Sequence, residues 1–81
     1  MTKHPIDVRT TPVDGTPTLD EGTPFLAPGV AEDRPGWVLY YPAESGGVEE
    51  FRFVDVWGGD VARAEDMARY HLNNEAGGSG W

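Results

Sequence analysis

A strand–strand–helix pattern in residues 36–75 constrains the fold of this chain more than any other feature. Residues 37–41 and 48–57 are rich in aromatic and β-branched side chains, which favour β-strands. Pro42 cannot donate to a strand ladder and ends the first strand, and Gly46-Gly47 supplies residues that tolerate positive φ. The pattern therefore predicts an antiparallel β-hairpin.

Alternation along the two strands predicts which side chains share a face. In the first strand Trp37, Leu39 and Tyr41 point one way, and Val38 and Tyr40 point the other. The second strand places Glu49, Phe51, Phe53, Asp55 and Trp57 on one face, and Val48, Glu50, Arg52, Val54 and Val56 on the other. Both faces of this strand carry apolar residues. Either a bulge near residues 53–54 interrupts the alternation, or both faces of the sheet are partly covered.

A helical pattern follows the hairpin. Gly58-Gly59 breaks the strand, and Asp60 is a favourable N-cap residue. Apolar residues then recur at spacings of three and four over residues 60–75, and those expected to face the sheet are Val61, Ala64, Ala68 and Leu72. The small alanines allow the helix axis to approach a sheet closely. We therefore predict one C-terminal helix packed on one face of the hairpin.

Residues 1–35 hold six of the seven prolines, whose spacing leaves no room for a helix of two turns. Residues 6–10 alternate and predict a short edge strand, and Phe25–Ala27 predicts an apolar anchor docked on the core. We expect an extended Pro/Thr-rich arm over 1–35, the core over 36–75 and a flexible Gly/Ser tail over 76–81. The fold class is α+β: a small antiparallel sheet of two or three strands packed against one C-terminal helix.

The composition argues against several kinds of site. The chain has 81 residues and no cysteine, which excludes disulfides and thiolate metal sites. His4 and His71 lie too far apart in sequence to suggest a zinc pair, so we expect no metal and no cofactor. Asp55 is the best candidate for a general acid or base, but we expect it to face outward or to cap the start of the helix near residues 58–59. The protein is predicted not to be an enzyme.

The formal net charge of −8 repels nucleic-acid phosphates at long range. The order of strands and helix resembles the small DNA-binding domains at the N-termini of phage integrases, in topology alone and without a diagnostic motif. Here the hairpin offers Arg52 alone against Glu44, Glu49, Glu50 and Asp55, whereas DNA binding needs several cationic contacts. Direct binding of nucleic acid is therefore disfavoured.

Location and source are predicted from the same composition. No segment approaches 18 consecutive apolar residues, and the first residues lack the apolar run of a signal peptide. We therefore expect no membrane span and a cytoplasmic, soluble protein. The abundance of Arg over Lys, together with Gly, Ala, Asp and Val, suggests a phage or actinobacterial accessory gene.

Aromatic side chains on both faces of the hairpin exceed what one helix can cover, so the second face needs the arm or another molecule. We expect a small acidic interaction protein, an accessory or inhibitor protein, that binds a protein partner through an aromatic hairpin surface. Pairing of hairpin edges would also give a homodimer. The residues expected to contact the partner are Tyr40, Tyr41 and Trp57, with Glu44, Glu49 and Glu50 at the rim. The alternative is an acidic mimic of nucleic acid that blocks a DNA- or RNA-binding protein through its carboxylates.

Overall fold

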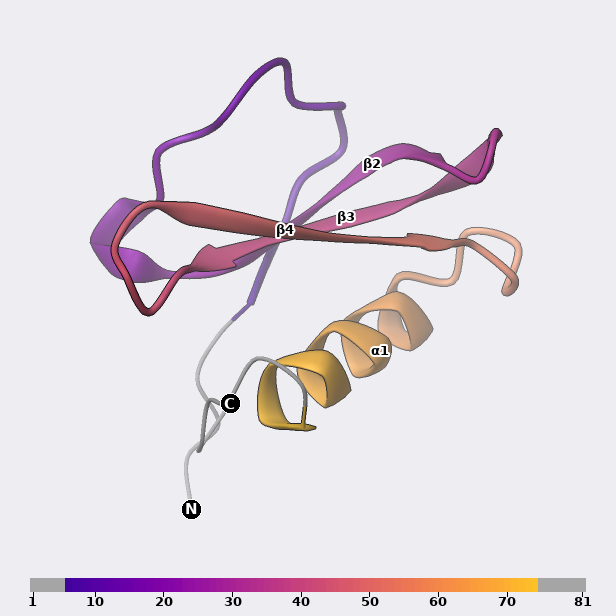
Figure 1. The fold of residues 1–81 in the computed structure, drawn as a ribbon. Helices are drawn as coiled ribbons and strands as arrows, with labels where there is room; N and C mark the ends of the chain where they lie inside the picture. The colour runs from indigo at the N-terminus through magenta and orange to yellow at the C-terminus, as the bar shows by residue number, and fades with distance from the viewer. Residues whose placement is uncertain (1–5, 75–81) are drawn as a thin grey trace.

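Residues 6–74, the part of the chain that the computed structural model describes, form a mixed sheet of four strands with an α-helix against one face (Figure 1). The elements in chain order are β1 (Asp7–Val8), the 3₁₀ helix η1 (Asp20–Gly22), β2 (Phe25–Ala31), β3 (Arg34–Pro42), β4 (Val48–Val54) and α1 (Val61–Asn74). The α+β class and the C-terminal helix are confirmed, but the sheet has more strands than the two or three predicted. The predicted tail at 76–81 lies outside the described residues.

The strands lie in the order β1-β2-β3-β4. β3 is antiparallel to both of its neighbours, so that Leu39 is opposite Leu26 in β2 and Phe51 in β4. The pairing of β3 with β4 runs unbroken over the whole of β4, which confirms the predicted hairpin and leaves no bulge within it, but β4 ends at Val54 and not at residue 57 as predicted. β1 is parallel to β2, with Asp7 opposite Phe25, and the sheet is therefore mixed rather than wholly antiparallel.

β2 differs from the sequence prediction, which expects residues 25–27 to be an isolated anchor. Proline within this segment argues against a strand, yet the position of Pro28 is tolerated. The Pro24 and Leu26 carbonyl oxygens accept backbone hydrogen bonds from the β1 side, with N···O distances of 3.1 Å and 2.8 Å. Pro28 lies two residues further along and presents its nitrogen to the same side, beyond the last β1–β2 pair at Leu26. Its missing N–H therefore removes no ladder bond.

The turn between β2 and β3 carries no strong signal in the sequence. Glu32 and Asp33 both adopt positive φ, at 52° and 60°. Two-residue hairpin loops of this geometry usually carry Asn or Gly. The predicted boundary at residue 35 consequently falls inside β3, and the expectation that residues 36–75 supply the core is wrong in that β2 contributes to it.

Buried side chains form two clusters, one on each face of the sheet. We call the face under α1 the helix face; its cluster comprises Ile6, Leu26, Trp37, Leu39, Tyr41, Phe53, Ala64, Ala68 and Leu72, with Phe51 and Trp57 packed against it. We call the opposite face the arm face; its cluster comprises Phe25, Ala27, Val38 and Tyr40, with Val13, Leu19 and Val48 packed against it. The predicted division of the β3 side chains between the two faces is confirmed.

Residues 9–24, which we call the arm, connect β1 to β2 across the arm face (Figure 1). Val13 and Leu19 supply its apolar contacts, and the Arg9 guanidinium lies 3.7 Å from the centre of the Phe25 ring. Of the two explanations that the sequence left open for apolar residues on both faces of β4, a bulge and partial cover of both faces, the structure supports the second. The edge strand predicted at residues 6–10 is shorter, because only Asp7–Val8 pairs with β2.

α1 buries Ala64, Ala68 and Leu72 against the sheet, as the helical spacing predicts. Val61 departs from the prediction, since 41% of it remains exposed in the first turn. Within residues 6–74, no helix has the length and apolar character needed to cross a membrane.

Candidate functional site

The two hairpin tyrosines are not available as a binding surface. Tyr40 is 4% exposed on the arm face, where its ring stacks on Phe25 with centroids 5.0 Å apart. Tyr41 is 8% exposed on the helix face, and its hydroxyl lies 3.2 Å from His71 Nε2. The expectation that Tyr40 and Tyr41 are exposed is wrong, because the arm and α1 cover the two faces to which they point.

The other predicted contact residues do not share one surface. Glu44 is exposed in the loop between β3 and β4. Glu49 and Glu50 are exposed on β4 but alternate between the helix face and the arm face. Trp57 is partly buried in the connection between β4 and α1. Of the predicted aromatic residues, only Trp57 therefore remains accessible for contact with a partner.

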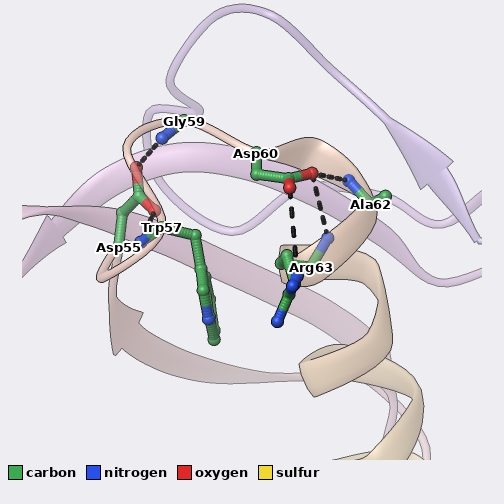
Figure 2. A network of polar contacts seen from close by, with 6 residues as sticks. All are labelled: Asp55, Trp57, Gly59, Asp60, Ala62 and Arg63. Carbon is green, nitrogen blue, oxygen red and sulfur yellow. Dashed lines mark hydrogen bonds and ion pairs between the residues drawn. The ribbon is translucent and has the colours of Figure 1, made fainter.

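The connection that carries Trp57 is held by the Asp55 carboxylate (Figure 2). Its Oδ1 accepts a hydrogen bond from the Trp57 backbone N–H at 3.0 Å, and its Oδ2 accepts one from the Gly59 N–H at 2.6 Å. The tight loop also needs positive φ at Gly58 and Gly59, at 65° and 87°, which glycine adopts without strain. Asp55 thus stabilises the loop and does not cap the start of α1, which was one of the two roles expected of it from the sequence.

Asp60 ends this connection and begins α1. Its Oδ1 accepts hydrogen bonds from the backbone N–H groups of Ala62 and Arg63, at 3.1 Å and 3.3 Å, which confirms the predicted N-cap. The Arg63 Nε lies 4.0 Å from Asp60 Oδ2. Together the two aspartates fix the loop at both ends, and they hold Trp57 in place next to the first turns of α1 (Figure 2).

A hollow of about 370 Å³ lies between this loop and the outer side of α1, and we call it the Trp57 groove. It is lined by Trp57, Arg63, Asp66, Met67 and Tyr70. Tyr70 is 61% exposed and Met67 36% exposed, so both apolar surfaces are open to solvent. The Trp57 indole is supported from below by Phe53, whose ring meets it edge-on at a centroid distance of 6.2 Å.

Four of the five residues that line the groove, all except Trp57, were not predicted from the sequence as contact residues. Arg63, Met67 and Tyr70 recur at spacings of four and three, which places them on one side of a helix. That signal was present, but it lies beside the stripe of Ala64, Ala68 and Leu72 and is weaker in hydrophobicity. The position of Trp57 next to it depends on the loop geometry and not on any spacing in the sequence.

A second hollow, also of about 370 Å³, opens on the arm face and is more polar. Tyr40 lies at its edge, with Glu50 and Arg52 from β4 and Thr16 from the arm. Burial raises the pKa of the Tyr40 hydroxyl above its ordinary 10.0; the Glu50 carboxylate adds to the rise, and the Arg52 guanidinium opposes it. The phenol is therefore neutral at physiological pH and offers a hydroxyl, not an anion.

His71 is partly buried and packs against aromatic side chains of the sheet. Its ring stacks on Phe51 with centroids 3.9 Å apart and planes within 3°, and it contacts the Tyr41 hydroxyl. Glu75, which follows His71 by four residues in the sequence, lies outside the described residues. In the described part of the chain no group of three or more metal-binding side chains is arranged to hold an ion.

Comparisons of the chain with protein-family models, with curated proteins and with solved structures found no match.

Proposed function

We propose that the protein binds another protein through the Trp57 groove, and that it acts by occupying that partner's surface. The observation that carries the proposal is the exposure of Tyr70 and Met67 beside Trp57 on elements that are already ordered. Trp, Tyr, Met and Arg are enriched in the centres of protein interfaces, and Trp, Tyr and Arg dominate their binding energy. A rigid groove also loses less conformational entropy when a ligand enters it.

The partner segment should carry an apolar anchor side chain flanked by Lys or Arg. The apolar anchor would fill the space between Trp57 and Tyr70. The basic flanks follow from charge, because the chain carries 14 acidic against 6 basic residues, and Asp66 lies in the groove itself. Complementary charge of this kind raises the association rate and favours basic partners over acidic ones.

A random peptide display library selected against the intact protein tests the proposal. We expect the enriched peptides to share a Leu, Phe, Trp or Met anchor with adjacent Lys or Arg. The double variant Met67→Ala/Tyr70→Ala should weaken their binding by about tenfold or more, since each truncation at an interface centre costs roughly 1 kcal/mol or more. Both residues lie on the outer side of α1, so the variant should fold normally.

Val30→Ala is the matched control, because Val30 is also apolar and 61% exposed but lies on β2 and is not among the residues that line the groove. It should bind the selected peptides as the unmodified protein does. Selected peptides that bind the double variant equally well, or that lose binding to the Val30→Ala variant, would refute the groove as the site.

Acidic mimicry of nucleic acid makes a different prediction. It requires carboxylates in a row, whereas Glu49 and Glu50 point to opposite faces and Glu50 pairs with Arg52 at 3.3 Å. A mimic would lose its partner steeply as salt is raised and would be indifferent to Met67→Ala/Tyr70→Ala. The same peptides measured over a salt series therefore separate the two functions.

A further inference from the structure

Among the described residues 6–74, no strand pairs with the outer side of β4, because it is the last strand in the order β1-β2-β3-β4. At the two ends of the β3–β4 hairpin, Asp55 N donates to Pro35 O and Ala43 N donates to Gly47 O, each at 3.1 Å. Hydrogen-bonded pairs alternate along an antiparallel ladder. The backbone groups of Glu49, Phe51 and Phe53 therefore bond to β3. Those of Val48, Glu50, Arg52 and Val54 point toward the open side.

The sequence of this open strand, Val-Glu-Glu-Phe-Arg-Phe-Val, is complementary to itself when it is reversed about Phe51. In an antiparallel pair of two identical strands centred on Phe51, Glu50 of one copy lies opposite Arg52 of the other. By symmetry, Arg52 of the first copy lies opposite Glu50 of the second. Val48 lies opposite Val54 in the same way. All four of these residues present backbone N–H and C=O groups to the open side, so these pairs are the ones that exchange hydrogen bonds.

We propose that the protein forms a two-fold symmetric dimer in which β4 pairs antiparallel with β4 of a second copy, with Phe51 on the symmetry axis. The two four-stranded sheets then become one continuous sheet with both α1 helices on the same face. Opposite charges directly across such a pair are stabilising, and like charges are destabilising. The strand thus presents a charge pattern that accepts its own copy.

Charge selects this register over its neighbours. A shift of two residues in one direction places Glu50 opposite Glu50 of the other copy, and a shift in the other direction places Arg52 opposite Arg52. A shift of one residue would place the backbone N–H and C=O groups that point to the open side of one β4 opposite residues of the other β4 whose N–H and C=O groups are already bonded to β3, so the two strands could not exchange hydrogen bonds. The register centred on Phe51 is therefore the one that combines full overlap of β4 with two pairs of opposite charges.

The Arg52 guanidinium is turned toward β2, so it must turn to the open side of β4 to make this contact. Arg52 Nη2 lies 3.3 Å from Glu50 Oε2, and Arg52 Nη1 donates to the Val30 carbonyl oxygen at 3.2 Å. The Arg52 and Glu50 side chains nevertheless remain 45% and 47% exposed. A second copy would place two arginines and two glutamates in an alternating square. Because the paired strands bury little area, the dimer should be weak and its population should depend on concentration.

Charge reversal tests the proposal. Glu50→Arg and Arg52→Glu each place like charges across the interface, and each should raise the dissociation constant of the dimer by about tenfold or more. Equal mixing of these two variants restores both pairs of opposite charges in a heterodimer. Sedimentation velocity of the intact chain over a concentration series, with mass-labelled variants for the mixture, measures each species.

We expect a dimer from the unmodified protein, monomers from each single variant, and a heterodimer from their mixture at the unmodified affinity. The heterodimer also guards against misfolding, because two unfolded variants would not recover by mixing. Asp66→Arg changes charge to the same extent on α1, away from β4, and should leave the dimer unchanged. A monomer at all concentrations, or variants that dimerise as the unmodified protein does, would overturn the proposal.

The register can be tested separately by disulfide cross-linking. Because the chain contains no cysteine, a single introduced cysteine can form a disulfide only with its counterpart in the other copy. Glu50 and Arg52 bracket Phe51, so Phe51→Cys would place two thiols directly opposite one another at a separation suited to a disulfide. Glu49→Cys, the matched control, would face Phe53 of the other copy and should not cross-link. Preferential cross-linking through Glu49→Cys would contradict the register. The dimer uses β4 and not the Trp57 groove, so Met67→Ala/Tyr70→Ala should leave it intact.

Discussion

The two faces of the sheet are covered in different ways. On the helix face a regular helix buries Ala64, Ala68 and Leu72, which belong to a cluster of nine buried residues. On the arm face a connection without regular strands covers a cluster of four, chiefly through Val13 and Leu19. The comparison teaches that a small chain with one helix can bury aromatic side chains on both faces of a sheet when a proline-rich segment covers the second.

The different coverings imply different stabilities. α1 contributes its own hydrogen-bonded backbone and a stripe of close contacts, whereas the arm is fixed by a few apolar contacts and by Arg9 over the Phe25 ring. Segments with few buried contacts open locally at lower free energy than the core. We therefore expect the arm face to be the weaker of the two.

The largest expected effect tests this difference directly. Leu39→Ala removes a side chain with no exposed surface from the helix face and should lower the free energy of unfolding by about 2–5 kcal/mol. Leu19→Ala removes the same atoms from the half-buried arm contact and should cost about 1 kcal/mol. Urea denaturation followed by tryptophan fluorescence measures both. Equal losses in the two variants would contradict the ranking of the faces.

A smaller effect concerns the attachment of α1. Asp60→Ala removes the acceptor for the Ala62 and Arg63 N–H groups and should cost about 1 kcal/mol of unfolding free energy. Asp60→Asn keeps a side-chain oxygen and should retain most of that stability. Chemical denaturation of both variants checks the prediction, and an equal loss in the two would show that the charge of Asp60 matters more than its capping bonds.

The smallest effect appears only at high pH and belongs to the arm face. The raised pKa of Tyr40 means that the folded protein holds this proton more tightly than the unfolded chain, whose ordinary pKa is 10.0. Its contribution to stability is therefore complete below pH 10 and is lost as the pH rises through the raised pKa. Tyr40→Phe should flatten the fall in the urea midpoint above pH 10. If the urea midpoint of this variant falls above pH 10 as steeply as that of the unmodified protein, groups other than Tyr40 cause the loss of stability.

Much of the fold was predictable from local patterns. The β3–β4 hairpin and α1 follow from alternation, from the glycine breaks and from the N-cap at Asp60. β2 was not predictable, because Pro28 argues against a strand and the Glu32-Asp33 turn lacks the usual residues. Pro28 is tolerated because β1 ends before it, and where β1 ends relative to β2 is a feature of the tertiary structure that local sequence patterns do not reveal.

The candidate site was less predictable than the fold. Trp57 was identified from the sequence. Tyr40 was assigned to the surface because nothing in residues 9–24 signals that the arm returns over the sheet, and Tyr41 was assigned to the surface although it points to the face that α1 covers. The companions of Trp57 come from the outer side of α1, through a loop whose path is set by the Asp55 carboxylate. A binding surface made by two elements needs their relative placement, which side-chain spacing alone does not supply.

The central claim is that the accessible aromatic surface lies beside α1 and not on the hairpin. Photochemically induced dynamic nuclear polarisation tests it most directly, because a dissolved flavin enhances the NMR signals of a tyrosine only when its side chain is accessible. The chain has three tyrosines, and they divide cleanly between the two regions. We predict a strong enhancement for Tyr70 and none for Tyr40 or Tyr41; enhancement of Tyr40 or Tyr41 comparable to that of Tyr70 would contradict the account.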